Sequence, residues 1–126
     1  MSAVLRLQHS EPVRLDRSQL EVLYQSLGPV GADKVVNHAL EDLAVALARA
    51  SEEYRAGEIE PLRASVRSLV AVAQQVGMTL LARVGRDVLV LSSGDDGAAF
   101  AATMARLERI GEGSLVAVWD LQDLSI

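Results

Sequence analysis

Apolar residues recur at alternating intervals of four and three along residues 32–56, at Val36, Leu40, Leu43, Leu47, Ala50 and Tyr54. Because an α-helix has about 3.6 residues per turn, this spacing places all of them on one face of a helix. The pattern predicts a long amphipathic helix that ends at Gly57, the residue type that most readily forms a left-handed cap.

Shorter stretches with the same spacing predict helices before and after this one. A short helix is expected to begin at Asp16, with Gln19 in a capping-box position, and to stop at Gly28-Pro29. Its apolar face is Leu20, Leu23, Tyr24 and Leu27. The next long helix is expected to start near Glu58, with Pro61 tolerated in its first turn, and to end at Gly77. Its core stripe is Leu62, Val66, Leu69, Ala73 and Val76.

The sequence from Met78 onward also predicts helices. The stretch "MTLLARVGRDVLVLSSGDDG" contains "DVLVL", which alone could form a strand, but no neighbouring strand is evident, so we expect a helix there. A further helix is expected from about Gly97, with Asp95-Asp96 capping it. Gly111 and Gly113 are expected to bend or break this helix before a helical continuation. Its inward residues are Phe100, Met104, Leu107 and Ile110.

Composition supports an all-helical fold. Half of the residues are hydrophobic but only 3% are aromatic, so the core has to be built from Leu, Val and Ala, a mixture that favours closely packed helices. We therefore predict an all-α fold, an up-down four-helix bundle over residues 16–126 with a short preceding helix. Residues 1–15 are expected to form an extended segment.

Several functional classes find no support in the sequence. There is no cysteine, and His9 and His38 are too far apart to form a ligand cluster, so no metal site or cofactor is expected. The net charge of −5 and the scattered basic residues disfavour nucleic acid. No apolar run approaches the ~20 residues that span a bilayer, which favours a cytoplasmic protein with no membrane partner. No nucleophile–base pair or phosphate-binding loop is evident, so no enzymatic activity is expected.

The stretch "LRASVRSLVAVAQQVG" presents an arginine on the outer side of a helix whose inner side is clearly apolar. With Leu62 at 0° and about 100° per residue, the core stripe lies within about 40° of Leu62 and Arg67 lies near 140°. Arg63 and Gln74 lie close to Arg67 on this wheel. For both arginines, the simplest interpretation is a solvated surface residue.

Residues 12–118 resemble the histidine-containing phosphotransfer (HPt) domains of bacterial phosphorelays. "PVRLDRSQLEVLYQSLG" is similar to the entry segment and first helix of that family, and "YRAGEIEPLR" to the turn before its active helix. "RSLVAVAQQVG" falls on the stretch that carries the family's histidine, and "SSGDDGAAF" on its acidic turn. Scaffold positions of the family's pattern are kept at Gly57, Leu62, Ser68, Leu69, Ala73 and Gly77.

The resemblance implies a phosphotransfer scaffold without its chemistry. The phosphoacceptor histidine falls on Arg67, the following lysine on Val70 and the glycine after it on Ala71. A permanently protonated arginine offers no lone pair for attack on phosphorus. The resemblance therefore implies a signalling interaction module that binds the receiver domain of a response regulator without transferring phosphate. The binding face would consist of Arg63, Arg67, Val70, Ala71 and Gln74.

Two alternatives remain open. One is a structural bundle that forms a homodimer through apolar residues expected on its surface, Val70, Leu89 and Val90. The other is an active phosphotransfer protein that uses His38, which lies on the outward face of its helix about 200° from Val36. The helix around His38 loosely resembles the histidine helix of sensor kinases, although "ALEDL" follows the histidine where that family has Arg-Thr-Pro.

Overall fold

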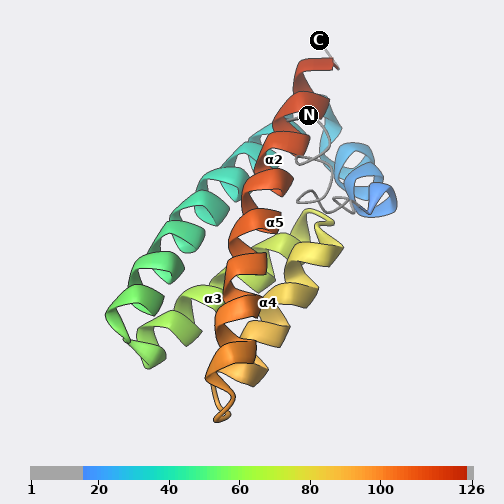
Figure 1. Ribbon diagram of the computed structural model, residues 1–126. Coiled ribbons are helices and arrows are strands. Elements are labelled where there is room, and N and C mark those ends of the chain that lie inside the picture. The colour runs from blue at the N-terminus through green and yellow to red at the C-terminus, as the bar shows by residue number, and fades with distance from the viewer. Residues whose placement is uncertain (1–15, 125–126) are drawn as a thin grey trace, which may run out of the picture.

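The computed structural model describes residues 16–124, which form four helices and no strand (Figure 1). These are α2 (Arg17–Ala56), α3 (Ile59–Gln75), α4 (Thr79–Leu91) and α5 (Gly97–Leu124). The predicted extended segment, residues 1–15, lies outside the described residues.

The helices form an up-down bundle. Each packs against the helix before it in the chain, and α5 returns to pack against α2, which closes the ring (Figure 1). The connections are short: Gly57-Glu58 joins α2 to α3, and the αL glycine Gly77 lies in the turn between α3 and α4. The predicted all-α four-helix bundle is confirmed.

The bundle core contains the residues that the spacing placed inward. The side chains of Leu40, Leu43, Leu62, Leu69, Met104 and Leu107 are all less than 2% exposed. Among the side chains that the structure describes, the aromatic rings of Tyr54 on α2 and Phe100 on α5 meet edge to face with centroids 5.1 Å apart. Leucine, valine and alanine make up most of the buried core, as the composition predicted.

A kink divides α2 into the predicted short helix and the predicted long one. Gly28 has φ 75° and ψ 169°, a conformation that other residues rarely adopt, and Pro29 starts the second helix. The hydroxyl of Tyr24 donates a hydrogen bond to Oδ1 of Asp33 at 2.5 Å, and this bond bridges the kink. Leu27 is 49% exposed, whereas the other three residues of the predicted apolar face are partly buried.

The start of α2 is fastened to the α3–α4 turn. Asp16 caps the helix by accepting bonds from the backbone N–H groups of Ser18 and Gln19, and its own N–H donates to the carbonyl oxygen of Gly77 at 2.6 Å. The side chain of Gln19 donates to the carbonyl oxygen of Gln75 and does not close the predicted capping box. The short helix is thus held by its cap at one end and by the kink at the other.

Two glycines do not break α5, contrary to the prediction for Gly111 and Gly113. The helix is continuous from Gly97 to Leu124, with Asp96 as the cap that accepts from the N–H of Ala99. A Cβ on Gly111 would lie 2.7 Å from Cδ2 of Leu47, so this glycine lets α2 approach α5 closely. Packing against α2 therefore explains a glycine that local propensity alone treats as a breaker.

Candidate docking face on α3 and α4

The outer side of α3 presents Arg67, Ala71 and Gln74 to solvent, as predicted. Within the part of the chain that the structure describes, the guanidinium of Arg67 forms no hydrogen bond or ion pair. Ala71 lies one turn further along α3, and its methyl group leaves the surface beside the arginine open. The face thus offers an unpaired cation next to a small residue.

Arg63 is not part of this open face, which corrects the sequence-based assignment. Its guanidinium crosses from α3 to the end of α4 and donates to the carbonyl oxygen of Leu89 at 2.7 Å and to Oγ of Ser93 at 2.8 Å. It also donates to Oγ of Ser92. Carbonyl groups in the last turn of a helix lack partners within the helix, so Arg63 satisfies one of them. Its role is to hold α4 against α3.

Val70 is buried, and its predicted place on the exposed binding face is wrong. Its side chain is 9% exposed and lies against α4 at Gly85. A Cβ on Gly85 would lie 2.5 Å from Cγ2 of Val70, so the missing methyl group is what lets the two helices approach. On the helical wheel Val70 lies outside the core stripe. It is buried because Gly85 lets α4 approach α3 closely at this point.

These contacts fix the register of the antiparallel pair α3 and α4. Gly85 lies opposite Val66 and Val70, and Arg63 reaches the carbonyl oxygen of Leu89. Arg67, between the two valines in the chain, is therefore level with the turn of α4 that contains Arg86. On a wheel of about 100° per residue, Arg86 lies next to Ala82 and Leu89 on the α3 side, directed outward.

Sequence reasoning missed two arginines on this side of the bundle. Arg83 and Arg86 on α4 are exposed, and neither forms a hydrogen bond or ion pair among the described residues. The period of α4 shows that both point outward, but only the register set by Gly85 brings Arg86 level with Arg67. We define the docking face as the exposed residues Arg67, Ala71 and Gln74 of α3 with Arg83 and Arg86 of α4.

Charge is unevenly distributed between this side and the rest of the molecule. Residues 59–91, which span α3 and α4, carry four arginines against Glu60 and Asp87, a net charge of +2. The whole chain carries −5, which leaves −7 for the residues outside this range. An acidic partner is therefore attracted to the α3–α4 side more than to any other.

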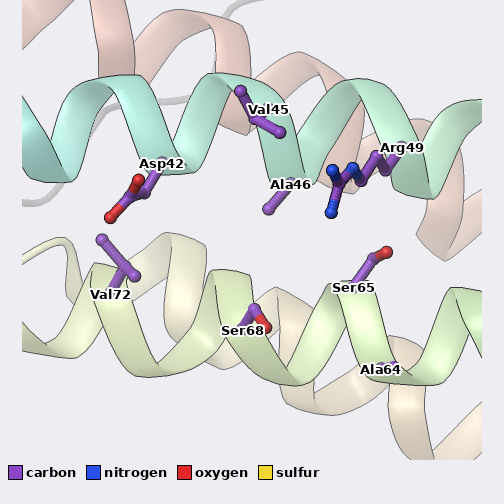
Figure 2. Close-up of a pocket in the computed structure, with 8 residues that line it drawn as sticks. All are labelled: Asp42, Val45, Ala46, Arg49, Ala64, Ser65, Ser68 and Val72. Carbon is purple, nitrogen blue, oxygen red and sulfur yellow. The ribbon is translucent and has the colours of Figure 1, made fainter.

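An open hollow of about 450 Å³ lies on the other flank of α3, between α2 and α3 (Figure 2). Asp42 and Arg49 extend from α2 toward α3, where Ser65 and Ser68 face them (Figure 2). Ser65 also donates to Oε1 of Glu53 at 2.6 Å, which ties the two helices near their connection. Arg67 does not line the hollow, so the two features are separate.

His38 lies on the outward face of α2, as predicted. Its side chain is 83% exposed, and Nδ1 lies 3.9 Å from Oε2 of Glu41, one turn along. It borders a shallow hollow with Val35, Asp42 and Gln75. A partner's active site could reach this histidine, and Lys34, an exposed lysine, lies one turn before it on the same face of α2.

The two residues considered for self-association lie in different environments. Leu89 is half-buried and packs against the core, whereas Val90 is 73% exposed. Because Val70 is buried and Leu89 is partly covered, the three residues do not form the exposed apolar cluster that the sequence suggested. Val90 stands at the edge of the docking face, one turn from Arg86.

No group of three or more His, Asp or Glu side chains among the described residues is arranged to hold a metal ion. None of the described helices has the length and apolar character needed to cross a membrane. No protein-family model, curated protein or solved structure matches the chain. The assignment of function therefore depends on the geometry and chemistry of the bundle itself.

Proposed function

We propose that this protein is a non-catalytic signalling module of the cytoplasm that binds the receiver domain of a response regulator through the outer side of α3. The observation that carries the proposal is Arg67, an exposed guanidinium with no partner among the described residues, beside the small Ala71. Support also comes from the resemblance of the sequence to phosphotransfer domains, in which this position carries the phosphoacceptor.

The chemistry of the proposed contact follows from the two surfaces. A receiver's phosphorylation pocket is lined by carboxylates, and a planar guanidinium can pair with a carboxylate through two parallel hydrogen bonds. Arg67 cannot accept a phosphoryl group, because it has no free nitrogen lone pair near neutral pH. The module would therefore occupy the pocket of a receiver and shield its aspartate without exchanging phosphate with it.

Isothermal titration of the full chain against receiver domains encoded in the same genome tests the proposal. A binding receiver is expected to lose about tenfold or more in affinity with Arg67→Glu, since like-charge repulsion replaces attraction, at about 1.4 kcal/mol per decade. Arg49→Glu provides a matched control, because Arg49 is an exposed arginine at the α2–α3 hollow. Equal affinities of wild type and Arg67→Glu would show that Arg67 is an ordinary solvated residue.

A further inference from the structure

Arg86 gives the docking face a second cation from a different helix. We propose that Arg67 of α3 and Arg86 of α4 together form a clamp for an acidic protein surface, with Arg83 at its edge. The inference rests on the proposed function, since it extends the same face, and it assigns to α4 a recognition role that the sequence did not indicate.

The register of α3 against α4 places the two arginines at one level of the bundle. Val70 and Gly85 are in close contact below the surface, and Arg67 and Arg86 follow in the chain the residues that pack around this contact, Val66 and Gly85. Both side chains are exposed, and the helix period directs both toward the outer side of the contact between α3 and α4. The acidic residues of α3 and α4 lie away from this pair: Glu60 is about two turns before Arg67, and Asp87, the residue after Arg86, is turned about 100° from it around α4.

Two like charges at one level of neighbouring helices repel each other. Within residues 16–124 neither guanidinium has a hydrogen-bonded or ionic partner. A partner that inserts carboxylates here removes the repulsion and gains hydrogen bonds to ionised groups, which are stronger than those between neutral groups. The arrangement thus favours an acidic ligand over a neutral one.

The charge of the rest of the molecule selects among acidic ligands. A nucleic acid or an anionic membrane presents an extended field of phosphates, and the −7 carried outside residues 59–91 would oppose it over most of the surface. A protein surface with a local group of carboxylates meets only the α3–α4 side. We therefore assign the clamp to a protein partner with a compact acidic pocket.

The scaffold holds the two helices that carry these cations in a fixed register. Arg63 ties α3 to the carbonyl oxygen of Leu89, and the glycine contact holds the helices close near their middle. Little backbone rearrangement is then needed on binding, which lowers the entropic cost of association.

The clamp is tested with octaglutamate as a probe and the ¹⁵N-labelled full chain, followed by amide chemical shifts at low salt. Shifts are expected around Arg67 and Arg86 and not around Arg49. Arg86→Glu should weaken octaglutamate binding about fivefold or more, while Arg49→Glu should change it less than twofold. Raising the salt concentration should weaken binding by the wild type, because exposed charges are screened beyond about 8–10 Å.

Affinity measurements with a receiver domain that binds the wild type then distinguish a failure of the clamp from a failure of the proposed function. A loss of affinity with both Arg67→Glu and Arg86→Glu supports both. A loss with Arg67→Glu alone overturns the clamp and leaves the proposed function standing. If no receiver binds, the proposed function fails, and the octaglutamate titration decides on the clamp by itself; shifts spread equally over the Arg49 side would overturn it.

Discussion

Arg63 of α3 donates a hydrogen bond to the carbonyl oxygen of Leu89 of α4 at 2.7 Å, so an arginine of one helix closes the end of the next. The same guanidinium is bonded to the hydroxyl groups of Ser92 and Ser93, which follow α4. The outer side of α3 therefore divides its arginines between two tasks. Arg63 holds the bundle together, and Arg67 remains available to a partner.

Replacing Arg63 is expected to destabilise the fold. Arg63→Ala removes the hydrogen bonds that join α3 to the end of α4, although the Leu89 carbonyl still accepts from the Ser92 hydroxyl, and should lower the free energy of unfolding by about 1–2 kcal/mol. Arg67→Ala is the matched control on the same helix and should change that free energy by less than about 0.5 kcal/mol. Urea denaturation followed by circular dichroism measures both. Equal effects of the two substitutions would contradict the structural role of Arg63.

Adding a methyl group at Gly85 is expected to force α3 and α4 apart. The new Cβ would lie 2.5 Å from Cγ2 of Val70, and overpacking of this kind costs about 1–3 kcal/mol. Alanine regains about 1 kcal/mol through its higher helix propensity, so a net loss of up to about 2 kcal/mol is expected for Gly85→Ala.

Shortening Val70 in the same chain should relieve that clash. The double variant Gly85→Ala, Val70→Ala is therefore expected to be more stable than the sum of the two single changes predicts. Thermal unfolding of the four proteins of this cycle gives the coupling. Strict additivity would mean that the two positions are not in contact.

Tyr24 provides a spectroscopic probe of the kink in α2. The hydrogen bond to Asp33, together with partial burial and the nearby negative charge, raises the pKa of Tyr24 to about 12. The neutral phenol is thus favoured in the folded state. Since the unfolded pKa is about 10, this contribution to stability is fully present below about pH 10 and is lost as the pH rises toward 12.

The titration can be isolated because the chain has two tyrosines, Tyr24 and Tyr54. In a Tyr54→Phe background, the near-ultraviolet absorbance of tyrosinate should report Tyr24 alone. Asp33→Asn should then lower its pKa toward the ordinary value of about 10. An unchanged titration in Asp33→Asn would show that the bond across the kink does not form.

Phosphotransfer is expected to be absent. Incubation with a labelled phosphorylated receiver should leave no acid-labile phosphate on the protein, because Arg67 has no nucleophilic nitrogen. Arg67→His alone is not expected to restore transfer, because the adjacent Val70 is a buried apolar residue and supplies no cation. Label that appears on the wild type and disappears in His38→Ala would instead establish His38 as a phosphoacceptor.

The periodic spacing of apolar residues predicted the helices well, including the one that contains "DVLVL". This succeeds because one buried stripe per helix is a local property of the sequence. The errors at Val70, Arg63 and Gly111 have a common cause. The environment of each residue depends on which residue of another helix lies opposite. The sequence does not indicate that Gly85 and Leu47 are the residues in contact with Val70 and Gly111.

The candidate site was predictable to the same extent. Exposure of Arg67, Ala71 and Gln74 follows from the period of α3 alone, and this exposure was predicted correctly. The position of Arg86 relative to Arg67 depends on the register between two helices, which the period of either helix leaves undetermined. Long-range packing, more than local pattern, therefore decides which charges share a surface.

Two separate constraints act on the evolution of the sequence at Gly85. A side chain there would separate α3 from α4 and at the same time change the spacing between Arg67 and Arg86. Selection for a stable core and selection for the charge spacing on the surface would act on the same site. In a population of variants, lineages that acquire a substitution at Gly85 are expected to compensate first at Val70. Only lineages that preserve the spacing between Arg67 and Arg86 would retain the same partner.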